Sequence, residues 1–285
     1  MKRERRLGPR EFAMYHALGN DYVVVDQPSF EQRLTKANVL KLCDRHTGLG
    51  CDGILARAPS RRADFGLRIF NPDGSEAEKS GNGIRIFARF LHDFGYTRRH
   101  ELSIETPGGV VRARLFLRGA AVLKVKVEMG AVSFRSGDVG ATGPAREMLR
   151  ERIELDTRKV EATCVSIGNP HAVIFVEQLR DIDLQEIGPQ LEAHPLFPRR
   201  INVQLARPLA RNRIDALVWE RGAGATLASG SSSCAVAAAA RRLGLADERV
   251  QVGMPGGRLS VHVHDDYTVD LVGSCTPICR GRLLG

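Results

Sequence analysis

The sequence has little of what marks several large classes of protein. No apolar run approaches the roughly 20 residues that a membrane-spanning helix needs. The basic start, residues 1–6, lacks the apolar stretch and small-residue cleavage site of a secretory signal. The sequence therefore predicts a cytoplasmic protein that has no membrane partner.

Paired cysteine motifs are also missing. Cys275 and Cys279 are separated by three residues and no histidine cluster accompanies them, so the cysteines predict no zinc site, and we expect no metal. In a reducing compartment the six cysteines are most simply buried thiols. They are Cys43, Cys51, Cys164, Cys234, Cys275 and Cys279.

Aromatic residues are few, which bears on the partner that the basic charge suggests. The net charge of +9 raises nucleic acid or an anionic small molecule as a partner. However, only 6% of residues are aromatic, the arginines are scattered through the chain, and no stacking platform or recognition motif is present. A solvated basic surface is the preferred interpretation, and no nucleic-acid partner is expected.

What the sequence does contain is an internal repeat. Ser229 follows Ser80 by 149 residues, and each serine stands in front of a glycine and an apolar helical pattern. Other short segments recur at the same offset or at 148. The matching pairs are 80–83 with 229–232, 19–21 with 168–170, 67–70 with 216–219, and 107–109 with 255–257. Four matches in nearly one register indicate a duplication.

The duplication predicts an α+β protein of two pseudo-symmetric domains, and 285 residues suit two domains. We expect each to be a mostly antiparallel sheet or barrel wrapped around a central helix. The first helix would bury Ile84, Ile86, Phe87 and Phe90, and a further amphipathic helix is predicted over 30–43. The expected domains are 1–130, to which the tail 273–285 returns, and 131–272.

The two Ser-Gly steps would start the two central helices and are expected to face each other, for chemistry on both faces of one carbon. Backbone N–H groups at a helix start converge on an anion, and the helix dipole adds about half a positive charge. Taken singly, each step is more simply a helix N-cap and each nearby asparagine a turn residue. The duplication favours a functional role.

Six segments, in order along nearly the whole chain, resemble the diaminopimelate epimerase family. They are 19–23, 45–53, 70–76, 81–85, 168–171 and 220–224. The resemblance implies a cofactor-independent isomerase that interconverts LL- and meso-diaminopimelate, a step toward lysine and cell wall. It implies removal of the α-proton from one face and its return on the other. The partner would be a small amino acid, and a homodimer is left open.

The resemblance also implies roles by position. Arg221 suits a bidentate clamp on a carboxylate and Glu220 suits pairing with an ammonium. The residues at the distal, non-reacting end of the substrate would be Asn20, Asn71, Asn169, Asn202, Glu220 and Arg221. Those at the reacting carboxylate would be Gly81, Asn82, Gly230 and Ser231.

The chain departs from the family pattern at the two catalytic positions. Where the family has a cysteine before each glycine step, this chain has Ser80 and Ser229, which remain the predicted catalytic residues. A serine hydroxyl is a far weaker acid than a thiol and needs a neighbouring general base. Ala225 and Ser232 also differ from the usual glutamate and glycine.

No nearby residue clearly restores the base. Lys79 is read as a solvated lysine, Cys51 at least as readily as a buried thiol, and His171 as a packing or hydrogen-bonding residue. Three functions therefore stay open. They are a diaminopimelate epimerase that uses the two serines, a related racemase, isomerase or dehydratase with other acid and base groups, and a non-catalytic amino-acid-binding protein.

Overall fold

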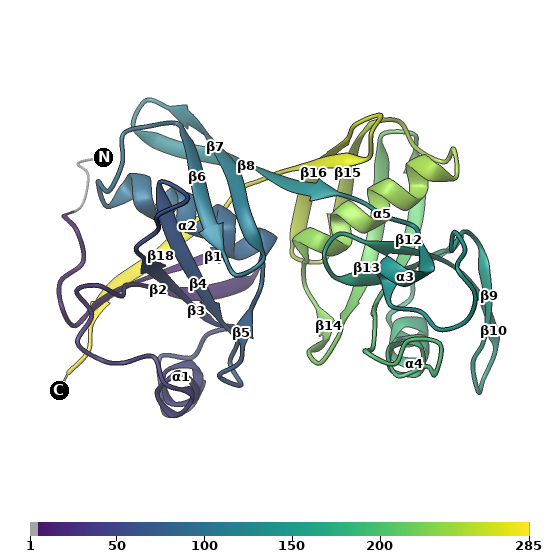
Figure 1. Cartoon of the computed structure of the whole chain (residues 1–285), viewed down its shortest axis with the longest axis horizontal. Coiled ribbons are helices and arrows are strands. Elements are labelled where there is room, and N and C mark those ends of the chain that lie inside the picture. Colours follow the sequence, from purple (N-terminus) through teal and green to yellow (C-terminus); the bar gives the residue numbers. More distant parts are fainter. Residues whose placement is uncertain (1–4, 285) are drawn as a thin grey trace. The chain divides into compact units, whose positions relative to one another are not determined.

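The structure is a computed structural model that describes residues 5–284. Residues 1–4, which belong to the basic start considered above, lie outside the described residues. Two compact units make up the fold (Figure 1): unit 1 runs to Glu128 and resumes at Val272, and unit 2 is Met129–Leu271. None of the helices within 5–284 is long and apolar enough to cross a membrane.

Unit 1 is a sheet with two helices. Its strands are β1 (Glu11–Ala17), β2 (Asn20–Asp26), β3 (Ile54–Ala58), β4 (Phe65–Phe70), β5 (Glu76–Ala77), β6 (Glu101–Thr106), β7 (Gly109–Arg118), β8 (Ala121–Ala131, which runs on into unit 2) and β18 (Thr276–Arg282). The helices are α1 (Lys36–Cys43) and α2 (Gly81–Asp93). The C-terminal strand β18, yellow in Figure 1, pairs with β1.

Unit 2 has the same kind of organisation. Its strands are β9 (Glu151–Glu154), β10 (Lys159–Ser166), β11 (Pro170–Phe175), β12 (Asn202–Ala210), β13 (Arg213–Glu220), β14 (Gly224–Thr226), β15 (Arg249–Met254), β16 (Gly257–Val263) and β17 (Thr268–Gly273, whose end lies in unit 1). The helices are α3 (Ser136–Val139), α4 (Asp181–Glu192) and α5 (Gly230–Arg242).

The two units repeat one topology, with the strand register at the offset seen in the sequence. In unit 1 the order is an antiparallel β1–β2 hairpin, a parallel β2–β3 pair and an antiparallel β3–β4 pair. Unit 2 repeats it with β10–β11, β11–β12 and β12–β13. Ile54 lies opposite Phe70, and Val203 opposite Trp219, 149 residues later. The predicted α+β fold of two similar domains is confirmed.

One helix per unit forms the centre of the core. In α2 the residues Ile84, Ile86, Phe87 and Phe90 are all fully buried, as predicted. In α5 the run from Cys234 to Ala240 is fully buried too, and its alanines present little side-chain volume to the surrounding strands. Because the run 234–240 of α5 is apolar on every face, exposing any part of it would cost burial free energy.

Two other predictions meet the structure differently. The helix predicted over 30–43 begins only at Lys36, because Thr35 is its N-cap and accepts a hydrogen bond from Asn38 N at 3.3 Å. The prediction for residues 30–35 is therefore wrong.

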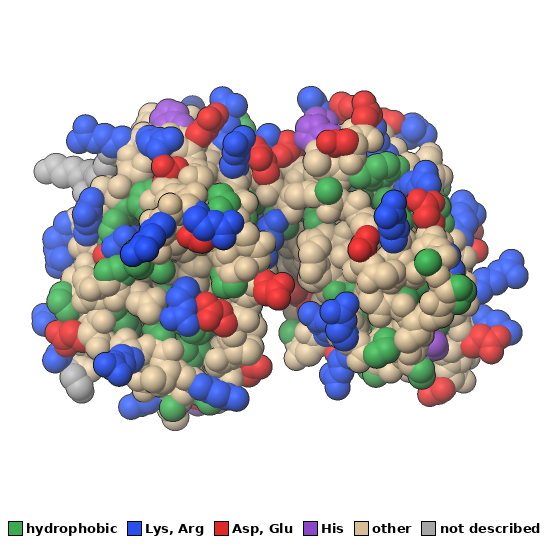
Figure 2. Space-filling view, in the orientation of Figure 1, with side chains coloured by type: hydrophobic (Ala, Val, Ile, Leu, Met, Phe, Trp, Pro, Cys, Tyr) green, Lys and Arg blue, Asp and Glu red, His purple; other side chains and the backbone are tan. Residues whose placement is uncertain are grey.

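On the face shown in Figure 2, Lys and Arg are interspersed with Asp and Glu, as expected of a solvated basic surface.

Candidate active site

Ser80 and Ser229 occupy the same local position in their units, as N-caps of α2 and α5. Ser80 has φ −140° and ψ 117°, and its Oγ accepts from Gly83 N at 3.0 Å. Ser229 has φ −135° and ψ 129°, and its Oγ accepts from Ser232 N at 3.4 Å. An α-helix leaves the N–H groups of its first turn without intrahelical acceptors, so each serine stands beside a potential anion site.

Within its own unit, neither serine hydroxyl is hydrogen-bonded to a strong base among the described residues. The Ser80 hydroxyl lies 3.4 Å from the Tyr22 hydroxyl, and Ser229 is 4% exposed. The described hydrogen bonds of these hydroxyls inside unit 1 and inside unit 2 involve no carboxylate, imidazole or amine. Cys51 is engaged elsewhere, because its buried thiol lies 3.6 Å from that of Cys43.

Each unit brings a hairpin asparagine to the first turn of its central helix. The hairpins turn at Gly19 and Gly168, whose φ angles of 91° and 90° favour glycine. In unit 1, Asn82 Nδ2 donates to Asn20 Oδ1 at 3.1 Å. In unit 2, Asn169 Nδ2 donates to Ser231 Oγ at 3.4 Å. The equivalent pairs are again 149 residues apart, so both halves build the same constellation around their serine.

In unit 1 this constellation is extended by charged groups. Asn20 Nδ2 donates to Asp52 Oδ2 at 2.9 Å. Arg45 bridges Asp52 and Asp21, with Nη2 to carboxylate distances of 2.7 and 2.9 Å. On the helix side, Arg85 is fully buried and donates to Asn82 Oδ1 at 2.7 Å. Both asparagine side chains are therefore oriented by charge-assisted hydrogen bonds.

In unit 2 a buried series of uncharged, hydrogen-bonded side chains occupies the corresponding place. Asn169 Oδ1 lies 3.1 Å from His171 Nε2, and His171 Nδ1 lies 3.1 Å from Gln204 Nε2. Gln204 Nε2 also donates to Ser232 Oγ at 3.1 Å. Since the amide of Gln204 donates to Nδ1, the proton of the imidazole belongs on Nε2, facing Asn169. This series of hydrogen bonds orients Asn169. It also gives the Ser232 hydroxyl a partner, and Ser232 is one of the positions that depart from the family pattern.

Burial keeps His171 neutral. The side chain is fully buried, and desolvation lowers its pKa to about 3. The structure thus places His171 as a hydrogen-bonding residue.

Gln204 was missed by sequence reasoning. Its one signal is a polar residue between the apolar Val203 and Leu205, at the position where unit 1 has Leu55 beside Gly83.

The neutral state of His171 predicts how the free energy of unfolding depends on pH. In the unfolded chain His171 binds a proton below about pH 6.5, and in the folded chain only below about 3. Between these values the unfolded state holds more protons, so stability falls as the pH falls, by up to about 1.4 kcal/mol per unit from this group. Urea unfolding at pH 5.5 and 4.5 should therefore show a smaller loss of stability for His171→Gln than for the wild type.

The control for this experiment is His100→Gln, which replaces an exposed histidine. It should keep the wild-type difference between the two pH values. An equal loss of stability in the wild type and His171→Gln would contradict a buried neutral imidazole at this position.

The distal-end residues of unit 2 are also brought together. Asn202 Nδ2 donates to Pro170 O at 2.8 Å, and Asn202 Oδ1 accepts from Arg221 N at 2.9 Å. Asn202 therefore ties the asparagine hairpin to the segment that carries Arg221. The Arg221 side chain is exposed, donates to Arg199 O at 3.0 Å, and has no carboxylate partner among the described residues. Glu220 Oε1 accepts from Thr226 Oγ1 at 2.8 Å.

Asn71 makes its described side-chain hydrogen bond within its own turn. Its Nδ2 donates to Ser75 Oγ at 2.9 Å within the turn after β4. Its counterpart at the 149-residue offset is Glu220, which also bonds a hydroxyl beyond the following turn. Gly81 and Gly230 are the first residues of α2 and α5. None of the described contacts joins Asn71 to Asn20 or Asn82.

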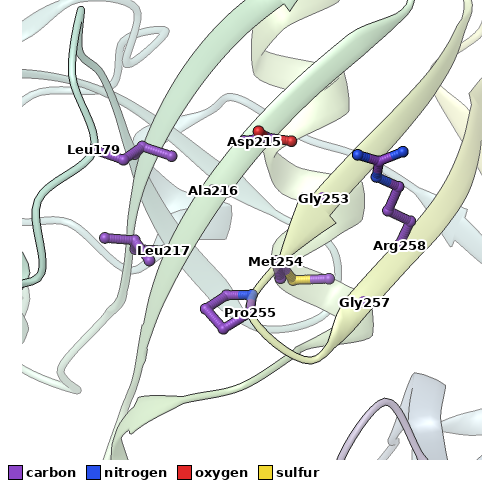
Figure 3. A pocket seen from close by; sticks show the side chains of 9 residues that line it. All are labelled: Leu179, Asp215, Ala216, Leu217, Gly253, Met254, Pro255, Gly257 and Arg258. Carbon is purple, nitrogen blue, oxygen red and sulfur yellow. The ribbon is translucent and has the colours of Figure 1, made fainter.

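A pocket of about 320 Å³ in unit 2 has a different lining (Figure 3). Asp215 and Arg258 are its charged residues, and Asp215 fits there because Gly253 has no Cβ. Its lining residues contain none of the predicted site residues, so we do not assign the chemistry to it.

Comparison with known proteins agrees with this arrangement. The family described as diaminopimelate epimerase matches residues 12–135 and 163–274. Diaminopimelate epimerase 2 of Nostoc sp. is 46% identical over 274 residues, which cover 96% of this chain and 95% of that protein. Diaminopimelate epimerase of Moorella thermoacetica is 39% identical over 280 residues, covering 95% and 98%.

Among solved structures, a hydroxyproline epimerase from Agrobacterium vitis with bound trans-4-hydroxy-L-proline superimposes with a TM-score of 0.72. It shares 14% identity, and the match covers 96% of this chain and 92% of that one. That likeness shows a common fold, while the sequence matches show common descent. The chain belongs to the diaminopimelate epimerase family.

Proposed function

We propose that this protein is a cofactor-independent amino-acid epimerase that interconverts LL- and meso-diaminopimelate, with Ser80 and Ser229 in the two proton-transfer positions. One observation carries the proposal. In each unit an N-cap serine precedes the central helix. The second residue after that serine, Asn82 or Ser231, is hydrogen-bonded to an asparagine of a hairpin. Epimerisation needs one proton acceptor and one donor, and two equivalent positions supply both roles.

The helix starts would bind the reacting carboxylate. Their N–H groups and dipoles favour an anion and stabilise the negative charge that develops when the α-proton leaves. Gly81 and Asn82 in unit 1, and Gly230 and Ser231 in unit 2, are the residues proposed for this task. One serine would receive the proton on one face of the carbon, and the other would return a proton on the opposite face.

The distal end of the substrate is proposed to lie against Arg221 and Glu220, with the amides of Asn20, Asn71, Asn169 and Asn202. Arg221 supports this because its guanidinium is exposed and has no carboxylate partner within residues 5–284. A second carboxylate on the ligand would complete a bidentate pair. An amino acid with one carboxylate would leave that arginine unused.

A second function, amino-acid binding without catalysis, is favoured by a specific observation. Within its own unit, neither serine hydroxyl contacts a carboxylate, imidazole or amine among the described residues, and a serine needs such a neighbouring base to take up a proton. The two functions differ in a measurable way, since only the first exchanges the α-proton with solvent.

Solvent-deuterium exchange into the α-carbon of LL- and meso-diaminopimelate, followed by NMR, decides between them. We expect slow exchange by the wild type, above the rate in buffer. The control is Ser80→Gly/Ser229→Gly, which removes both hydroxyls but costs helix capping only a few tenths of a kcal/mol. Exchange that persists in the glycine variant would remove the serines from the mechanism. Binding without exchange in the wild type would establish the non-catalytic function.

The proposal also covers location and partners. It places the protein in the cytoplasm, with a small amino acid as its ligand and no nucleic acid, and it leaves a homodimer open. These parts rest on the family and on the interspersed surface charge (Figure 2). Light scattering coupled to size exclusion tests the dimer.

A further inference from the structure

A cluster of metal-binding side chain types lies in unit 2 outside the proposed active site. His262 is near the end of β16, His264 directly follows that strand, and Asp270 is in β17. One ligand atom from each of the three side chains lies within 4.8 Å of the other two. None of the three residues belongs to the set predicted to bind the substrate or to transfer protons.

The local fold explains why the three side chains meet. Residues two apart on a strand project from the same face, which puts His262 beside His264. Their ring centroids are 4.0 Å apart. The chain then turns back, closed by a hydrogen bond from His264 N to Thr268 O at 2.9 Å, and returns as β17. Asp270 thereby reaches His264, with 3.0 Å between Asp270 Oδ2 and His264 Nε2.

The other acidic residues of this hairpin are already engaged. Asp265 pairs with Arg241, and Asp266 accepts from Thr268 N at 2.9 Å to stabilise the turn. Asp270 is 7% exposed, and its Oδ2 faces the His264 imidazole. Glu248 lies nearby as well, with Oε1 3.7 Å from His262 Nε2.

We propose that His262, His264 and Asp270 form a binding site for a divalent transition-metal ion such as Zn²⁺. In a tetrahedral zinc site, ligand atoms about 2.0–2.1 Å from the metal lie roughly 3.3 Å from one another. The spacing of His264 Nε2 and Asp270 Oδ2, 3.0 Å, is close to this. His262, whose ligand atom lies within 4.8 Å of the other two, would supply the third ligand. Water or Glu248 takes the fourth position.

The donor set selects the class of metal. Two imidazoles and one carboxylate suit Zn²⁺, Ni²⁺ or Cu²⁺, whereas Mg²⁺ and Ca²⁺ prefer oxygen ligands throughout. The ion would join the end of β16 to β17, and β17 runs on to Val272, where the chain passes from unit 2 to unit 1. Binding should therefore stabilise this hairpin against unfolding.

Calorimetric titration of the untagged full chain with ZnCl₂ tests the site. We expect one Zn²⁺ per chain and no binding of Mg²⁺. His264→Ala and Asp270→Asn should each weaken binding at least about tenfold, since loss of a supporting residue alone costs that much. The matched control, His100→Ala, replaces an exposed histidine elsewhere and should bind as the wild type does. Zn²⁺ at about 100 times its Kd should raise the Tm by roughly 5 °C.

The exposed thiol of Cys279 offers the competing explanation. Binding that is lost in Cys279→Ser and kept in both His264→Ala and Asp270→Asn would overturn the proposal, as would a thiolate charge-transfer band in the Co²⁺-substituted protein. Because the readouts are binding and Tm, the outcome is independent of whether the protein is an epimerase. Circular dichroism of each variant separates a lost ligand from a lost fold.

Discussion

The double variant Ser80→Cys/Ser229→Cys is expected to exchange the α-proton of diaminopimelate about 100-fold faster than the wild type, or more. Each thiol would sit at a helix N-terminus, where the positive end of the dipole lowers the thiol pKa from about 8.5 toward neutrality. A serine hydroxyl in the same place stays protonated, and no described base contacts it. The measurement is the deuterium-exchange rate by NMR.

The two single variants are the matched controls. With one thiol, proton removal accelerates on one face only, so each single variant should speed exchange for one configuration at the α-carbon and not the other. The pH dependence of iodoacetamide alkylation reports the pKa of each new thiol. Five of the native cysteines are buried, and Cys279, which is exposed, is replaced by serine as background. A double variant that exchanges more slowly than the wild type would show that the serines work by a mechanism of their own.

Arg221→Lys is expected to weaken binding of diaminopimelate about 10- to 100-fold, although it keeps the positive charge. A lysine ammonium is a point charge and cannot replace the two parallel N–H donors that a guanidinium presents to a carboxylate. The backbone of Arg221 is already held by Asn202, and one guanidinium nitrogen by Arg199 O. The side chain is therefore partly pre-oriented for its ligand. Isothermal calorimetry gives both affinities.

Two controls separate this clamp from a general effect of charge. Arg211→Lys, at an exposed arginine that pairs with Asp247, should leave the affinity unchanged. L-Lysine has the second ammonium but lacks the second carboxylate, so it should bind both the wild type and Arg221→Lys equally weakly. Equal affinity of the two proteins for diaminopimelate would show that Arg221 does not hold the distal end.

The order of strands and helices could be predicted from the sequence because the duplication repeats the local patterns that mark turns, helix starts and buried segments. Glycines that turn both hairpins, serines that cap both central helices and the apolar runs behind them recur 149 residues apart. Since each signal acts over a few neighbouring residues, a repeated sequence predicts a repeated topology. The strand register then shows the same offset. The start of α1 was missed because the apolar pattern extends through residues 30–35, whereas the cap at Thr35 decides where the helix begins.

Other features depended on residues that are distant in the sequence. Gln204 meets His171 and Ser232 only because β12 pairs with β11 and α5 packs against both strands. His-x-His at 262 and 264 was visible in the sequence. Its carboxylate partner, Asp270, was not, because the turn between the strands sets which residues face each other.

The sequence by itself determined the family, the two similar domains and the placement of a serine at the start of each central helix, since these depend on local propensities and on their repetition. Only the tertiary structure decided which side chains those serines meet. Hydrogen-bond partners are chosen by strand register and helix packing, which bring together groups 62 residues apart at Asn20 and Asn82. The same packing left both hydroxyls without a described base and gathered two histidines and an aspartate on one hairpin.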